Sequence, residues 1–204
     1  MVPVVLQWGL LLLVLFTALP GDAFMKTENG TDRVTPETTD RGLVDFNQAE
    51  ATDSWRVVND GVMGGRSQSE IAFTDKGTAL FQGTVSLENN GGFASVRTDI
   101  PARPLKDQAG IVLCVRGDGK RYQLMVRTDQ RTDGVSYRYA FATRAGAWTT
   151  VRAPWSEFVP VFRGRIVPDA PPLAPSRIRR VGFLISDKQA GPFQLEIESI
   201  ATYK

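Results

Sequence analysis

From Leu43 to the C-terminus, the chain is a series of short runs in which apolar and polar residues alternate, separated by glycine-rich turns. Within residues 121–128, for example, Tyr122, Leu124 and Val126 alternate with Arg121, Gln123 and Arg127. A period of two is typical of a strand with one buried and one solvated face. No stretch of this part carries apolar residues at helical spacing. The pattern therefore predicts an all-β domain, built as a β-sandwich or jelly roll.

The boundaries of the expected elements follow from the turn residues between the runs. Single helical turns are expected at Trp155–Phe158 and Pro175–Ile178, and the Pro- and Arg-rich segment Phe162–Ser176 is expected to be a long surface loop. The expected strands are 43–46, 55–58, 68–74, 78–87, 92–98, 110–115, 121–128, 136–143, 148–152, 179–186 and 193–200.

Composition excludes several classes of chemistry. The 204 residues include no histidine and one cysteine, and the net charge is +2. Without histidine there is no Ser-His-Asp triad, no Cys-His dyad and no histidine-ligated zinc. Cys114 alone forms no internal disulfide, and it lies in an apolar run where a small core side chain is expected. The even charge balance does not favour a nucleic-acid partner.

The acidic residues allow two further kinds of site, a pair of catalytic carboxylates and a calcium site. Glu196 and Glu198 share one face of an expected strand, and paired carboxylates on a β-sandwich can hydrolyse glycosides. A solvated outer face is the favoured interpretation of this pair. Asp60, Asp118 and Asp187 would bind a structural calcium only if their loops converged. We therefore predict a protein that is not an enzyme and that has no cofactor and no metal centre.

The N-terminal region differs in composition from the rest of the chain. Val4–Leu19 is an uncharged apolar run, and small residues before Phe24 fit cleavage after Ala23. We expect residues 1–23 to be a signal peptide or an N-terminal anchor, which would be the only membrane contact. The protein would then be periplasmic or secreted, or anchored. Translation from Met25 would make it cytoplasmic instead. Residues 24–42 are polar and predicted to be a disordered linker, and residues 43–204 the folded domain.

One loop carries more turn residues than a connection between two strands requires. After the strand that begins at Trp55, the chain breaks at Asn59-Asp60-Gly61 and again at Gly64-Gly65, around the lone Met63. Glycine adopts positive φ without a Cβ penalty, and Asn and Asp tolerate that region. We interpret this loop as a candidate binding site. The alternative is structural: Trp55 and Met63 plug one end of the sandwich while the loop satisfies its own backbone groups.

We predict that this loop, Asn59–Ser67, packs beside Asn89–Phe93 and near Asp187–Phe193, since each segment is rich in turn residues and departs from a period of two. Together they would form one ligand- or partner-binding region. The candidate site residues are Trp55, Asn59, Asp60, Gly61, Met63, Gly64, Gly65, Ser67, Asn89, Asn90, Phe93, Asp187 and Gln189.

The same segments belong to a longer series of ordered sequence blocks that spans residues 44–201. The blocks are Trp55, Asn59–Ser67, Phe81–Gly83, Glu88–Arg97, Arg116–Gly119, Tyr137, Phe141, Trp148, Phe162–Arg165 and Ser186–Phe193. In these blocks the chain resembles the CIA30 family, which comprises complex I intermediate-associated protein 30 and its bacterial relatives.

The resemblance implies a galactose-binding-domain-like β-sandwich, in agreement with the strand pattern. It also implies an assembly factor that holds intermediates of respiratory complex I and is not itself a catalyst. On this basis we predict a non-enzymatic, chaperone-like module that binds a protein partner, including unfolded protein. The alternative is a carbohydrate-binding module of an exported protein, in which Trp55, Trp148 and Trp155 stack on a glycan.

Overall fold

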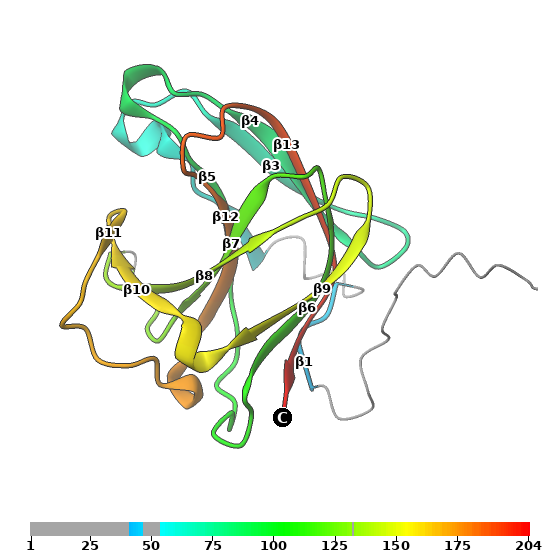
Figure 1. Cartoon of the computed structure of the whole chain (residues 1–204), viewed down its shortest axis with the longest axis vertical. Coiled ribbons are helices and arrows are strands. Elements are labelled where there is room, and N and C mark those ends of the chain that lie inside the picture. Colours follow the sequence, from blue (N-terminus) through cyan, green and yellow to red (C-terminus); the bar gives the residue numbers. More distant parts are fainter. Residues whose placement is uncertain (1–40, 47–53, 132) are drawn as a thin grey trace, which may run out of the picture. The chain divides into compact units, whose positions relative to one another are not determined.

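The computed structural model describes residues 41–46, 54–131 and 133–204, all within one structural unit, Thr31–Lys204. The predicted signal or anchor and the linker up to residue 40 lie outside the described residues. The described chain forms two antiparallel sheets whose inner faces share one core (Figure 1), which confirms the predicted all-β sandwich. Its helices are short 3₁₀ turns, and none in these ranges has the length and hydropathy to span a membrane.

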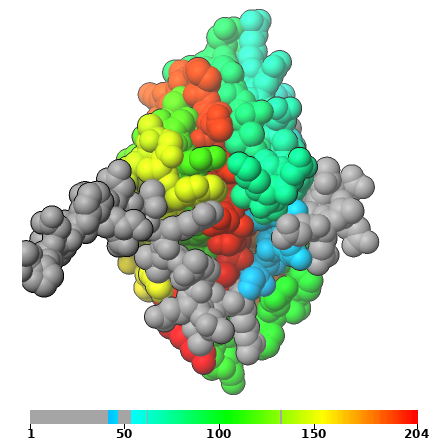
Figure 2. All heavy atoms as spheres, turned by 90° about the vertical axis from the view of Figure 1, so that its right-hand side faces the viewer, coloured from blue at the N-terminus to red at the C-terminus, as the bar shows by residue number. Residues whose placement is uncertain are grey.

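The six-stranded sheet has the order β3-β4-β13-β6-β9, and β1 pairs with the end of β13. Figure 2 shows the outer side of this sheet, where the blue segment 41–46 lies beside red β13. The strands of this sheet are β1 (Arg41–Val44), β3 (Gln68–Phe73), β4 (Ala79–Val85), β6 (Gly110–Gly117), β9 (Trp148–Pro154) and β13 (Gly191–Tyr203).

The seven-stranded sheet has the order β11-β10-β8-β7-β12-β5-β2 and carries the candidate site on its outer face. Its strands are β2 (Trp55–Val57), β5 (Ala94–Asp99), β7 (Arg121–Arg127), β8 (Ser136–Ala142), β10 (Val159–Phe162), β11 (Arg165–Ile166) and β12 (Arg180–Ile185). The 3₁₀ turns are η1 (Asp60–Met63), η2 (Glu88–Asn90), η3 (Trp155–Glu157) and η4 (Pro175–Arg177).

The core lies between the two sheets and is built from the apolar positions of the alternating runs. The Phe193 ring on β13 packs edge-on against Phe81, with 4.8 Å between ring centroids, and against Tyr122 of the opposite sheet at 6.5 Å. The fully buried Tyr122 keeps its hydroxyl within hydrogen-bond distance of the Asp118 carboxylate (2.9 Å) and the Gln194 carbonyl (3.0 Å). Burial and the Asp118 charge raise the pKa of this phenol above its usual value.

Two differences from the sequence prediction are strands that lie in segments expected to be irregular. The predicted surface loop at 162–176 contains the end of β10 and all of β11, joined by a two-residue turn at Arg163-Gly164. Both turn residues have positive φ (46° and 78°), as in the hairpin turns whose twist matches that of the flanking strands. Strand β1 begins at Arg41, inside the predicted linker, because its pairing with Thr202 requires only backbone groups.

The structure also corrects the expectation that Glu196 and Glu198 share a solvated face, because Glu196 is buried. A register shift between Ile197 and Ser199 interrupts the alternation of β13, as a β-bulge does. Glu196 is buried, and its carboxylate accepts hydrogen bonds from the Arg116 guanidinium and from the Thr78 hydroxyl (2.9 Å). This carboxylate therefore joins strands within the six-stranded sheet.

Candidate functional site

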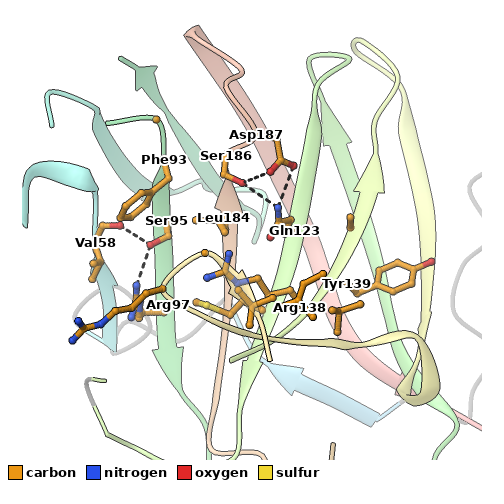
Figure 3. A pocket seen from close by; sticks show the side chains of 18 of the residues that line it. Val58, Phe93, Ser95, Arg97, Gln123, Arg138, Tyr139, Leu184, Ser186 and Asp187 are labelled. Carbon is orange, nitrogen blue, oxygen red and sulfur yellow. Dashed lines mark hydrogen bonds between the residues drawn. The ribbon is translucent and has the colours of Figure 1, made fainter. Parts of the chain in front are cut away.

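A cleft of about 1150 Å³ opens on the outer face of the seven-stranded sheet. Its floor is formed by outward-facing residues of β5, β12, β7 and β8, including Ser95, Gln123 and Met125. The loop segment 90–93 and Met63 border it near the β2 and β5 edge, and Val159 and Ile166 border it on the β10–β11 hairpin. Figure 3 shows the floor and the segment Ser186-Asp187 at its rim.

Asp60 organises the border of the cleft at the predicted loop. Its side chain is fully buried (0% exposed) and accepts four hydrogen bonds that connect two loops. Ser67 donates from its backbone N–H (2.9 Å) and its hydroxyl (2.5 Å), while the N–H groups of Gly92 (2.7 Å) and Phe93 (3.2 Å) donate from the neighbouring loop. Burial acts to raise the pKa of Asp60, but these hydrogen bonds outweigh it and the pKa lies below the usual value.

The glycines of this region provide space for the Asp60 carboxylate. A Cβ on Gly65 would lie 2.4 Å from the Asp60 Cγ, and one on Gly91 would lie 2.6 Å from its Oδ2. Gly64 has φ +87° and ends the 3₁₀ turn η1, a left-handed conformation that glycine adopts most easily. The density of turn residues therefore has a structural cause in the buried carboxylate.

Other polar side chains of the predicted segments also hold these loops in place. Asn89, which has φ 54°, donates from its side-chain amide to the Gly64 carbonyl (3.1 Å). Asn59 accepts from the Ser69 hydroxyl (2.8 Å). Gln189 bonds both backbone groups of Arg121, at 2.9 Å and 2.8 Å, and so ties its loop to β7. The predicted contact between the segments 59–67 and 89–93 is confirmed, and Asp187 shares the cleft with both.

The predicted site residues thus separate into three groups. Trp55, Asp60 and Ser67 are buried, so their side chains position the structure and are not accessible to a ligand; Trp55 stacks on Phe183 in the core. Asn59, Gly61, Gly64, Gly65, Asn89 and Gln189 are absent from the cleft lining. The residues that do line it are Met63, Asn90, Phe93 and Asp187.

The sequence prediction missed the polar floor of the cleft. Arg97 on β5 and Arg138 on β8 line it, together with Gln123, which donates to Ser186 Oγ (3.0 Å) and to Asp187 Oδ2 (3.3 Å). The signal was present in the outward positions of the alternating strands, which the prediction treated as solvated surface. Only the pairing of β5, β12, β7 and β8 brings these positions together.

The acidic residues considered for calcium serve other contacts. One carboxylate oxygen of Asp118 accepts a hydrogen bond from the Gln194 N–H (3.1 Å), and the other accepts one from the Tyr122 hydroxyl. Within the described ranges, no group of three or more His, Cys, Asp or Glu residues is arranged to hold a metal ion. The cleft is lined by arginine, amide, hydroxyl and two carboxylate side chains among apolar ones.

This architecture is shared with solved binding modules. A family 11 carbohydrate-binding module from Clostridium thermocellum, in complex with a β-1,3-1,4-mixed-linked tetrasaccharide, superimposes with a TM-score of 0.58 over 80% of this chain and 95% of that module, at 16% identity. At this identity the likeness establishes the fold, which is the galactose-binding-like β-sandwich of such modules.

Sequence comparison assigns the family. The profile of complex I intermediate-associated protein 30 (CIA30) matches residues 44–197, and the chain belongs to this family. It is 31% identical over 179 residues to the mitochondrial complex I intermediate-associated protein 30 of Mus musculus, covering 78% of this chain and 54% of the mouse protein. It is 32% identical over 180 residues to an uncharacterized Schizosaccharomyces pombe protein, covering 78% and 82%. The chain spans about half the length of the mouse relative.

Proposed function

We propose that this chain is a non-enzymatic binding module that holds a protein partner in the cleft of its seven-stranded sheet, in the manner of an assembly factor for respiratory complex I. The family relationship supports an assembly role, because the matched profile and the mouse relative are both named for a complex I intermediate. The cleft is the proposed contact surface.

The observation that carries this proposal is the aliphatic border of the cleft. Met63 and Ile166 are each 66% exposed, and Val159 is 41% exposed. They come from the loop after β2 and from the β10–β11 hairpin, on either side of a floor that contains arginines. Methionine and arginine are enriched at protein interfaces, and apolar side chains grouped around one depression mark interaction sites more often than scattered ones do.

The same observation disfavours the carbohydrate alternative. None of the three tryptophans expected to stack on a glycan lines the cleft. Trp55 is in the core, Trp148 lies under the Arg116 guanidinium at 5.0 Å, and Trp155 donates its indole N–H to the Gln108 carbonyl at 2.6 Å. The large hydrophobic side chains exposed in the described ranges are all aliphatic, and these lack the flat faces on which sugar rings stack. The two aromatic side chains that line the cleft are only partly exposed.

The test compares partner capture by two neutral substitutions of exposed aliphatic residues. Met63→Gln removes an apolar contact inside the cleft, whereas Leu87→Gln makes the same kind of change at a residue that is 45% exposed and outside it. Tagged protein, cross-linked and recovered from the native host, is analysed by mass spectrometry for complex I subunits. We expect recovery to fall with Met63→Gln and to be retained with Leu87→Gln. Equal recovery by both variants would refute the cleft as the contact surface.

A further inference from the structure

The floor of the cleft holds two guanidinium groups, those of Arg97 and Arg138, that form no ion pair within the described part of the chain. The strand registers place Arg97, Gly182, Met125 and Arg138 in one row across β5, β12, β7 and β8. Three strand spacings, about 14 Å, separate the two arginine backbones. Between them, Gly182 leaves room for Arg97, since a Cβ there would lie 2.9 Å from the Arg97 Cβ.

The adjacent row of the same face shows how this sheet neutralises arginine elsewhere. Arg180 donates to the Asp99 carboxylate at 2.6 Å, and Arg127 donates to Asp129 at 3.2 Å. Arg97 and Arg138 form no ion pair with any residue in the described ranges. Both guanidinium groups donate to hydroxyls instead: Arg97 donates to Ser95 Oγ and Arg138 donates to Ser136 Oγ, each at 3.2 Å.

The guanidinium groups of Arg97 and Arg138 are partly desolvated. The Arg97 Nε is buried and has no hydrogen-bond partner among the described residues. Burial, together with the positive charges of Arg180, Arg127 and Arg138, lowers the pKa of Arg97 to about 10. Burial likewise lowers the pKa of Arg138, against the opposing effect of Asp187. A buried charge without a counter-charge is costly, so an anion between these guanidinium groups would be bound with a gain in stability.

We propose that Arg97 and Arg138 bind an Asp or Glu side chain presented by an extended peptide segment of a protein partner, with aliphatic side chains of that segment resting on Met63 and Val159. This inference rests on the proposed function, whose site it specifies. Arginine presents planar N–H donors that match a carboxylate.

A single carboxylate in an apolar peptide fits the cleft better than a polyanion does. Asp187 and Glu157 also line the cleft, and their negative charges would repel the repeated charges of a nucleic acid or a sulfated polymer. The aliphatic border formed by Met63 and Val159 matches apolar side chains on either side of one acidic residue.

The experiment selects peptides from a random display library on immobilised full-length protein. The selection is repeated with Arg97→Gln/Arg138→Gln and with the control Arg144→Gln/Arg177→Gln, which removes two exposed positive charges outside the cleft. We expect wild type and control to enrich peptides with one Asp or Glu between aliphatic residues. The consensus peptide is expected to bind the Arg97/Arg138 variant at least about tenfold more weakly, as for loss of a charged hydrogen bond.

Two further measurements keep the outcome decisive. The Arg97/Arg138 variant is expected to melt no lower than wild type, because the removed charges are desolvated and repel each other. Should that variant fail to fold, replacing the acidic residue of the peptide by its amide tests the same contact on wild-type protein, with the same expected loss.

Several results would overturn the inference. A consensus without an acidic residue would do so, as would equal affinity for wild type and the Arg97/Arg138 variant. If no peptide is selected but a glucuronate-containing oligosaccharide binds and Arg97→Gln abolishes that binding, the ligand is an acidic glycan. In each case, continued Met63-dependent capture of complex I subunits shows that the proposed function survives.

Discussion

Replacing Asp60 by alanine is expected to destabilise the domain severely. The substitution removes a fully buried carboxylate that accepts three backbone N–H groups and one hydroxyl. Leaving buried donors without an acceptor costs about 1–3 kcal/mol each, and partial repair by water reduces the sum. We therefore expect a loss of about 3–5 kcal/mol in the free energy of unfolding. For a domain of this size, that lowers the melting temperature by roughly 6–20 °C.

The assay is thermal unfolding followed by circular dichroism, with Asp169→Ala as the matched control. Asp169 is exposed, and its replacement should change the stability by less than about 0.5 kcal/mol. An Asp60→Ala protein that melts within about 2 °C of wild type would refute the argument that this carboxylate holds the two loops together.

The pH dependence of Asp60 provides an independent check. Because the folded-state pKa lies below the usual value, the stabilisation by Asp60 is complete above the unfolded pKa of about 3.9. It is lost as the pH falls from there through the folded pKa. The difference in melting temperature between wild type and Asp60→Ala should therefore be constant from about pH 5 to 8 and shrink below about pH 4. A difference that grows on acidification would contradict the assignment.

Three other substitutions, with Gly61→Ala as the control for the first, test contacts of the loops and the sheets. Gly65→Ala should lower the free energy of unfolding in urea by about 1–3 kcal/mol, because the added Cβ would collide with Asp60. Gly61→Ala should be nearly neutral, since nothing lies within 4 Å of its added Cβ. Equal effects of the two substitutions would refute the close packing at Gly65. Tyr122→Phe should lower the free energy of unfolding measured in urea by about 1–2 kcal/mol, with an unchanged m value, because a buried hydroxyl contact with a carboxylate and a carbonyl is lost. Glu196→Gln should destabilise by about 1–2 kcal/mol in thermal unfolding, and wild-type stability would show that its carboxylate contacts contribute nothing.

Alternation along the strands was sufficient to predict the sandwich, since the apolar positions of β7 and β8 that the sequence assigns to the inner face do pack in the core. The β10–β11 hairpin was missed because its turn places an arginine at positive φ, where glycine or asparagine is expected. The shift after Ile197 in β13 was also unpredictable, because a bulge adds one residue without any marker in composition.

The candidate site was predicted only in part, for a physical reason. A loop shaped around a buried carboxylate and a loop shaped around a ligand require the same turn residues, so the sequence could not separate Asp60 from Met63. Arg97 and Arg138 are 41 positions apart in the chain, as their numbers show, and meet only through the register of four strands. Long-range pairing of this kind is not encoded in any local pattern.

Site-specific photo-cross-linking can show whether the cleft of the seven-stranded sheet is the surface that contacts a protein partner. A benzophenone amino acid replaces either Met63, at the border of the cleft, or Leu87, outside it. Each protein is expressed in the native host and irradiated, and the cross-linked species are identified by mass spectrometry. We expect cross-links from position 63 to a complex I subunit and none from position 87. Cross-links from position 87 alone, or no protein cross-link from position 63, would contradict it.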